Sequence, residues 1–168
     1  KYKNQKNIIL AIGGDGTVNR ILNCIVGTDN ILGIIPLGSG NDFYKSMKKY
    51  FQEGSNKCDL VKINDRYFIN VACFGIDADV ASNKDKVTSK LIPKSQKYTA
   101  ALIKTFFQYK FRNLEIEIND EKLENEYTTV TVCNGMYYGG GYKISPSSNP
   151  NNGLLDVYIV DKVNKMRM

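Results

Sequence analysis

The chain opens with two short apolar runs that are separated by a helical pattern. Residues 7–12 (NIILAI) and 31–35 are almost wholly apolar and lead into turn-forming glycine or proline, which is typical of buried strands. Between them, from 18 to 26, apolar residues recur at every third or fourth position and predict an amphipathic helix. Strand, helix and strand in this order predict a parallel βαβ unit, followed by a second helix from Phe43 to about Phe51.

The pattern changes in the rest of the chain. Leucine and isoleucine alternate with glutamate over residues 114–118, which predicts a strand with one face in solvent. The segments 59–63 and 66–74 flank Asn64-Asp65 and predict a hairpin. Further strands are expected over residues 127–133 and 154–160, and a helix is expected over 95–109. This second part is therefore predicted to be mainly antiparallel β-structure.

The length and composition fit a globular protein of two small parts. The chain has 168 residues, of which 42% are hydrophobic and 24% charged. The change of pattern near residue 57 divides an α/β part, residues 1–57, from a β-rich part, residues 58–168. Only two strands are expected in the first part, fewer than a parallel sheet usually has, so both parts are expected to be fragments of larger domains.

Charge and cysteine content narrow the function classes. The net charge is +6, but the lysines are spread along the chain, and even the concentrations at 45–49 and 84–94 are interpreted as solvated surface, with no nucleic-acid partner. The four cysteines form no C-x-x-C pair and the chain has no histidine, so they are interpreted as reduced, mostly buried thiols of a cytoplasmic protein rather than zinc ligands. No apolar run approaches the ~18 residues that span a bilayer.

Two glycine-rich loops follow the two predicted parallel strands. The first, Gly13-Gly14-Asp15-Gly16-Thr17, connects a strand to a helix, where glycines and free N–H groups bind phosphate readily. The second, residues 36–43 (PLGSGNDF), follows the next strand, and both loops are expected at the same carboxyl edge of the sheet. A carboxylate in each loop suits a Mg²⁺ ion that bridges protein and phosphates, although helix capping is the alternative for both acids. The paired loops therefore predict a nucleotide-binding crevice.

The two motifs resemble those of the diacylglycerol kinase catalytic family, which includes bacterial lipid kinases and sphingosine and ceramide kinases. GGDGT alone is only moderately specific, because NAD kinases and phosphofructokinases carry close variants, whereas PLGSGNDF distinguishes the lipid kinases. The resemblance continues through DLVKINDRYFINVACFGIDADV and VCNGMYYGGGYKISPSSNPNNGLLDVYIV, and thus covers nearly the whole chain. It implies an ATP- and Mg²⁺-dependent kinase that phosphorylates a lipid alcohol such as diacylglycerol and contacts membranes peripherally.

The resemblance also implies roles for individual residues. Asp15 and Asp42 are expected to be catalytic, and with Asp59 they are expected to surround the metal. The nucleotide is expected to contact Gly13, Gly14, Asp15, Gly16, Thr17, Gly38, Ser39, Asn41 and Asp42. The second domain, a β-sandwich, is expected to close over the first, and the lipid is expected to enter between them. Phe74, Tyr137 and Tyr138 are expected either to line that cleft or to belong to the core.

Three implied features depart from the family pattern in this sequence. The Asp-Gly-Glu motif that supplies the catalytic base is absent before Met168, and the family's first strand is absent before Lys1. Where relatives place aspartates that hold a structural Mg²⁺, Asn151 and Asn152 stand here, and Asp156 alone is left for a weak second site. The alternatives are an NAD kinase-like phosphotransferase and a non-catalytic lipid- or nucleotide-binding relative.

Overall fold

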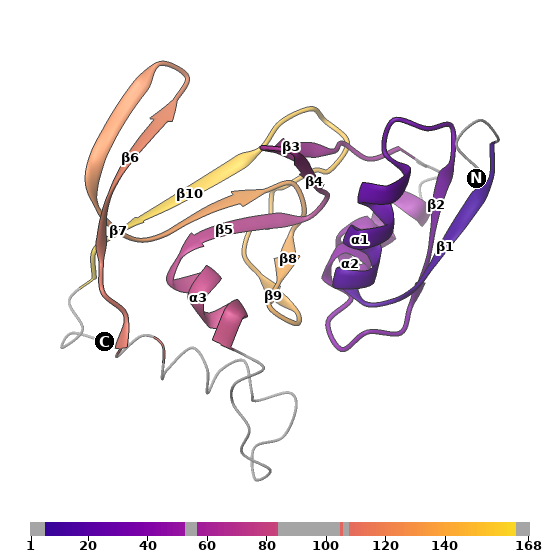
Figure 1. Cartoon of the computed structure of the whole chain (residues 1–168), viewed down its shortest axis with the longest axis horizontal. Coiled ribbons are helices and arrows are strands. Elements are labelled where there is room, and N and C mark those ends of the chain that lie inside the picture. The colour runs from indigo at the N-terminus through magenta and orange to yellow at the C-terminus, as the bar shows by residue number, and fades with distance from the viewer. Residues whose placement is uncertain (1–5, 53–56, 84–104, 106–107, 164–168) are drawn as a thin grey trace, which may run out of the picture. The chain divides into compact units, whose positions relative to one another are not determined.

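A computed structural model describes residues 6–52, 57–83, 105 and 108–163 of the chain (Figure 1). The chain forms two compact units that are not consecutive in sequence. The first unit comprises residues 1–71 and 133–156, and the second comprises residues 72–132 and 157–168. The division into domains after residue 57 stays a prediction.

The first unit begins with the expected βαβ arrangement. Its elements are β1 (Ile8–Gly13), α1 (Asp15–Ile25), β2 (Ile31–Pro36) and α2 (Asp42–Gln52). Strands β1 and β2 pair in parallel, with Ile8 opposite Ile31 and Gly13 opposite Pro36. The parallel pairing and both helices are confirmed.

Both helices pack against one face of the β1–β2 pair. The core contains side chains from β1, α1 and α2 together with residue 69 further along the chain: Ala11, Val18, Leu22, Phe43, Met47 and Ile69. The opposite face is not covered by described residues, because Ile8, Leu10 and Ile12 are 67%, 52% and 56% exposed. The prediction that these strands are buried on both faces is therefore wrong for the part of the chain that the structure describes.

Two small hairpins complete the first unit. Strands β3 (Val61–Ile63) and β4 (Arg66–Phe68) form the predicted hairpin around Asn64-Asp65, although its second strand ends earlier than expected. Asn23 of α1 holds this hairpin through two 2.8 Å hydrogen bonds with the backbone of Tyr67. Strands β8 (Tyr137–Tyr138) and β9 (Tyr142–Lys143) form the second hairpin, whose strand β8 packs against α2.

The second unit is a four-stranded sheet with one helix. Its elements are β5 (Val71–Gly75), α3 (Ile76–Asn83), β6 (Arg112–Ile118), β7 (Glu121–Cys133) and β10 (Asp156–Asp161). The long strand β7 pairs with β6 through its first half and lies between β10 and β5 in the sheet order (Figure 1). The turn between β6 and β7 places Asn119 and Asp120 in the left-handed region, as their short polar side chains allow. The predicted fold class, α/β followed by antiparallel β-structure, is confirmed.

Some predictions are corrected, and others lie outside the described residues. No helix was predicted over residues 76–83, where α3 lies, and its apolar residues show no clear helical stripe that would have revealed it. All four cysteines are free, but Cys24 is exposed, so burial of most thiols is only partly right. The helix predicted over 95–109 falls mostly outside the described residues, as do the lysines of 84–94. No helix within the described part is long and apolar enough to cross a membrane.

Candidate nucleotide and metal site

The two glycine-rich loops touch through their backbones. A β-carbon placed on Gly38 would stand 2.3 Å from the Cα of Gly14, and one placed on Gly14 would stand 3.0 Å from the Cα of Gly38. The amide of Leu37 also donates a 3.0 Å hydrogen bond to the carbonyl of Gly13. The structure therefore brings together the two loops that the sequence predicted to share one edge.

The first loop leaves the start of α1 open to an anion. Gly14 is the N-cap of α1 and has no side chain to bond the first turn, although its carbonyl accepts the N–H groups of Thr17 and Val18. Gly13 has φ +154 and no room for a side chain, because a β-carbon there would lie 2.6 Å from the hydroxyl of Thr17. Exposed N–H donors at a helix start attract phosphate oxygens, so this loop is suited to the role predicted for it.

The second loop is closed by Asn41. Its Oδ1 accepts the N–H of Gly38 at 2.9 Å, and its Nδ2 donates to the carbonyl of Gly38 at 2.8 Å. Asn41 itself takes a left-handed conformation, φ 53, which asparagine tolerates better than most residues. In this structure Asn41 shapes the loop, whereas Ser39 is exposed at its tip and Gly40 faces the acids.

Asp15 and Asp42 approach the same point beside Gly40. Oδ2 of each carboxylate lies 3.2 Å from the position of a β-carbon on Gly40. The other oxygen of Asp15, Oδ1, accepts the N–H of Phe43 at 2.9 Å and so caps the first turn of α2 from a different helix. Asp15 thus couples the two helix starts, and its Oδ2 lies beside the same glycine as Oδ2 of Asp42.

Asp42 is buried and only partly satisfied. Its Oδ2 accepts the N–H of Gly140 at 2.8 Å. Its Oδ1 is buried without a hydrogen bond, and the Nζ of Lys45 is 3.6 Å away, beyond hydrogen-bonding distance. A buried carboxylate oxygen with no hydrogen bond favours a cation, and Mg²⁺ is commonly held by one or two carboxylates together with substrate phosphates. The residues of this site therefore fit a Mg²⁺ ion.

A third glycine segment belongs to the same place. Residues 139–141 form the β8–β9 turn with three positive φ values, and the Cα of Gly140 is 3.3 Å from the β-carbon position of Gly40. Ser46 of α2 anchors this hairpin, because its buried hydroxyl accepts the N–H groups of Met136 and Tyr137 at 3.0 and 3.4 Å. In the sequence these glycines stand out only through the family resemblance, since their contact with Asp42 spans about a hundred residues.

Asp59 lies in a different setting. Its Oδ2 accepts the N–H of Gly153 at 2.7 Å, and its own N–H donates to the carbonyl of Pro150 at 2.7 Å. Within the described residues no three acidic or sulfur-bearing side chains gather closely enough to hold a metal ion. Asp59 therefore anchors the 150–153 loop, and its predicted metal role alongside Asp15 and Asp42 stays a prediction.

The carboxylate of Asp156 accepts hydrogen bonds from two serines. Its Oδ2 accepts the hydroxyl of Ser148 at 2.5 Å and that of Ser145 at 3.3 Å, and both serines are buried. The nearby Asn152 uses its side-chain oxygen to accept the N–H of Leu154 at 3.0 Å. These contacts hold Oδ2 of Asp156 without a cation, and the weak second Mg²⁺ site predicted at Asp156 stays a prediction.

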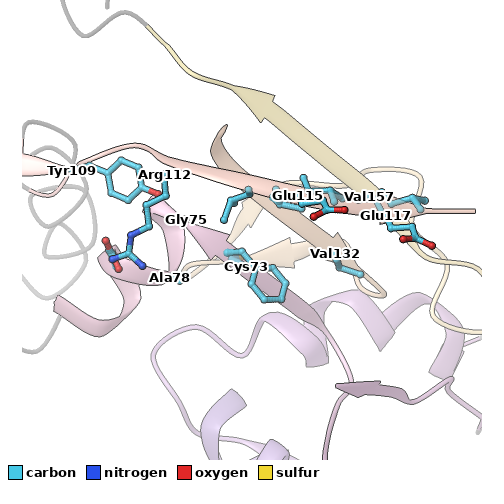
Figure 2. A pocket seen from close by; sticks show the side chains of 15 residues that line it. Cys73, Gly75, Ala78, Tyr109, Arg112, Glu115, Glu117, Val132 and Val157 are labelled. Carbon is cyan, nitrogen blue, oxygen red and sulfur yellow. The ribbon is translucent and has the colours of Figure 1, made fainter. Parts of the chain in front are cut away.

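The second unit contains a separate apolar hollow of about 610 Å³ (Figure 2). Its walls come from β5, α3, β6, β7 and β10, including Phe74, Val132 and Val157, with Tyr109 and Arg112 at one end. Burial, and secondarily the carboxylate of Asp79, raise the pKa of Tyr109. Phe74 is one of the residues that line this cavity. Tyr137 and Tyr138 are half-buried in β8 of the first unit.

Two of the cysteines have suppressed acidity. Burial and the neighbouring charge of Asp59 raise the pKa of Cys58 to about 12, although a hydrogen bond from Asn134 works in the opposite direction. Burial and the charge of Asp77 raise the pKa of Cys73 to about 11. Neither thiol is poised to act as a nucleophile near neutral pH.

Comparisons with known proteins give a consistent picture. Residues 1–70 match the family model described as "Diacylglycerol kinase catalytic domain", and residues 70–168 match "YegS C-terminal NAD kinase beta sandwich-like domain". Curated relatives from Staphylococcus haemolyticus and Staphylococcus aureus strain Mu3, each named as a putative lipid kinase, are 28% and 27% identical over 96% of this chain. The chain spans 56% of the length of each of these relatives.

Solved structures show the same relationship. A structure titled as a putative diacylglycerol kinase from Bacillus anthracis str. Sterne is 26% identical with a TM-score of 0.69, covering 92% of this chain and 56% of that chain. Another, titled as a diacylglycerol kinase from the same organism, is 25% identical with a TM-score of 0.66, covering 92% of this chain and 54% of that chain. The similarity therefore extends across both compact units.

Proposed function

Because this chain belongs to the diacylglycerol kinase catalytic-domain family, we propose that its protein transfers the γ-phosphate of ATP to the hydroxyl of a lipid alcohol. The observation that carries the proposal is the convergence of Asp15 and Asp42 on Gly40, where two glycine-rich loops meet. The acceptor class follows from the relatives named as lipid and diacylglycerol kinases. Such a substrate would be met at a membrane surface by peripheral contact.

The chain's own residues would act mainly by positioning. Gly13, Gly14 and the first turn of α1 would bind phosphate oxygens through backbone N–H groups, and Asn41 would keep the second loop in shape. Phosphoryl transfer needs little covalent help from a protein, because aligned reactants and neutralised charge supply most of the catalysis. The capping bond from Asp15 to Phe43 would keep the two helix starts aligned during the reaction.

Asp15 and Asp42 would hold a Mg²⁺ ion that enters with the nucleotide. The ion would supply neutralisation of the phosphate charge when bound. The buried Oδ1 of Asp42 and the Oδ2 of Asp15 are the two oxygens available for this, and Gly140 steadies the other oxygen of Asp42.

An NAD kinase-like activity is the second candidate. It is favoured by the description of the family model that matches residues 70–168, which names an NAD kinase-like β-sandwich. The same loops could bind ATP in either enzyme, so only the acceptor distinguishes the two. A relative that binds nucleotide or lipid without catalysis is the third reading.

The direct test offers several acceptors to the full-length protein that carries this sequence. Transfer of labelled phosphate from Mg-ATP is measured with mixed micelles of diacylglycerol, with other lipid alcohols and with NAD. Wild type is compared with Asp15→Ala and with Asp29→Ala, which replaces an exposed aspartate outside the loops. Labelled lipid that disappears in Asp15→Ala and persists in Asp29→Ala supports the proposal, whereas labelled NADP alone contradicts it.

A further inference from the structure

Lys45 lies one turn into α2, three residues after Asp42 of the candidate site. Its Nζ is 3.6 Å from the buried Oδ1 of Asp42, and its side chain is 41% exposed. On the opposite side, the same Nζ is 3.1 Å from the position of a β-carbon on Gly141 in the β8–β9 turn. Lys45 is thus a basic side chain close to both the predicted metal ligand and the third glycine segment.

The contact with Asp42 is loose. At 3.6 Å it is longer than the 2.7–3.2 Å of a hydrogen bond, and ion pairs at this helical spacing contribute only ~0.2–0.5 kcal/mol. Oδ1 therefore lacks a strong partner although it is buried, which costs ~1–3 kcal/mol in a typical protein. A loose cation beside an unsatisfied carboxylate can be exchanged for a tighter one at little cost.

A divalent cation at Oδ1 would displace the ammonium by charge repulsion. The lysine side chain is flexible and carries a compact charge with three donors, so it can turn to a nearby anion without moving α2. The anion in reach is the phosphate chain that the two glycine-rich loops are suited to bind. Gly141 offers no side chain to obstruct this movement.

We propose that Lys45 binds the phosphate chain of the nucleotide and exchanges places with a divalent cation at Asp42, an inference that rests on the proposed kinase function. Lys45 is then a positioning residue for the phosphate chain of the nucleotide. The sequence predicted that the lysines of 45–49 are solvated surface. The proposal gives Lys45 alone a phosphate-binding role instead. Lys48, exposed on the same helix, provides the matched control.

The test measures binding by the full-length protein with calorimetry. Wild type, Lys45→Met, Lys45→Arg and Lys48→Met are titrated with Mg-ATP, inorganic tripolyphosphate and adenosine, and separately with Mn²⁺ without nucleotide. A hydrogen bond to a charged group is worth ~1.5–3 kcal/mol, so Lys45→Met should weaken ATP and tripolyphosphate at least about tenfold and leave adenosine unchanged. Lys45→Arg should stay within about threefold of wild type, and Lys48→Met should not differ from it.

Mn²⁺ binding separates this role from a structural one. Removing a positive charge beside Asp42 should leave Mn²⁺ affinity in Lys45→Met equal to or higher than in wild type, whereas a damaged site would bind Mn²⁺ more weakly. Unchanged tripolyphosphate affinity in Lys45→Met, weaker Mn²⁺ binding in it, or an equal loss in Lys45→Arg would each overturn the proposal. Failure of wild type to bind Mg-ATP would instead overturn the proposed function itself.

Discussion

The Cα of Gly14 lies only 2.3 Å from the point at which Gly38 would carry a β-carbon. No real side chain tolerates such a distance, so the two loops can meet only while Gly38 has none. Their contact sets where the start of α1 and the start of α2 stand relative to each other within the first unit. Backbone proximity at this point is therefore a structural requirement for the proposed nucleotide site.

Gly38→Ala should separate the loops and lower both stability and nucleotide affinity. Forcing extra atoms into a closely packed place typically costs ~1–3 kcal/mol, which urea unfolding would measure. Gly16→Ala is the control, because no atom lies within 4 Å of its β-carbon position in the first turn of α1. That variant should be as stable as wild type or slightly more so. Equal stability of the two variants would contradict the requirement for contact at Gly38.

Asp15 is expected to combine a structural and a chemical role that two substitutions can separate. Asp15→Asn keeps an oxygen for the N–H of Phe43, whereas Asp15→Ala removes the cap and should cost ~0.5–2 kcal/mol of unfolding free energy. Both variants lose the negative charge, so both should lose Mg²⁺-dependent phosphate transfer. Full activity in Asp15→Asn, measured beside its urea unfolding curve, would limit Asp15 to capping.

The sequence predicted the parts of this molecule that depend on local periodicity. The alternation at 114–118 and the helical stripe at 18–26 each became the expected element, because side-chain spacing reports directly on one buried face. Helix α3 was not predicted, because its sequence IDADVASN has no helical stripe of apolar residues. The small number of strands predicted a fragment, but the face of β1 and β2 that the described residues leave exposed was not predicted, since a strand's own residues do not reveal how much cover its neighbours provide.

The sequence predicted the loops of the site but not the long-range hydrogen bonds that connect them. Glycine and aspartate at strand ends indicated a phosphate crevice, and the structure brings those loops together. The capping bond from the N–H of Phe43 to Asp15 and the bond from the N–H of Gly140 to Asp42 join residues 28 and 98 positions apart, and no local pattern encodes such pairs.

Ser46→Ala should loosen the β8–β9 hairpin. The buried Ser46 hydroxyl bridges the carbonyl of Asp42 and the N–H groups of Met136 and Tyr137, so its removal leaves buried donors unsatisfied at ~1–3 kcal/mol. Hydrogen exchange should therefore accelerate across residues 136–143, while the exposed Ser39→Ala leaves that segment unchanged. Unaltered exchange in Ser46→Ala would show that other contacts hold the hairpin.

Thiol alkylation should be selective and strongly dependent on pH. With a pKa of about 11, Cys73 is thiolate in only about a thousandth of molecules at pH 8, and Cys58, at about 12, even less. Exposed Cys24 should therefore react first with iodoacetamide, and modification of Cys73 should accelerate about tenfold per pH unit towards pH 11. Peptide mass spectrometry over a pH series would measure this; early labelling of Cys58 at pH 8 would contradict it.

Removal of divalent metal should leave the 145–156 loop intact. Asp156 is already held by the hydroxyls of Ser148 and Ser145, so excess EDTA should shift the unfolding midpoint of the nucleotide-free protein by less than about 1 °C. Asp156→Ala should instead remove the carboxylate that accepts from both buried hydroxyls and cost ~1–3 kcal/mol, with Ser148→Ala losing part of that amount. If EDTA lowered the midpoint by several degrees and added Mg²⁺ restored it in wild type but not in Asp156→Ala, a cation would belong at Asp156 after all. An EDTA effect that persists in Asp156→Ala would place the stabilising cation elsewhere, and Asp15→Ala would then show whether the first site holds it.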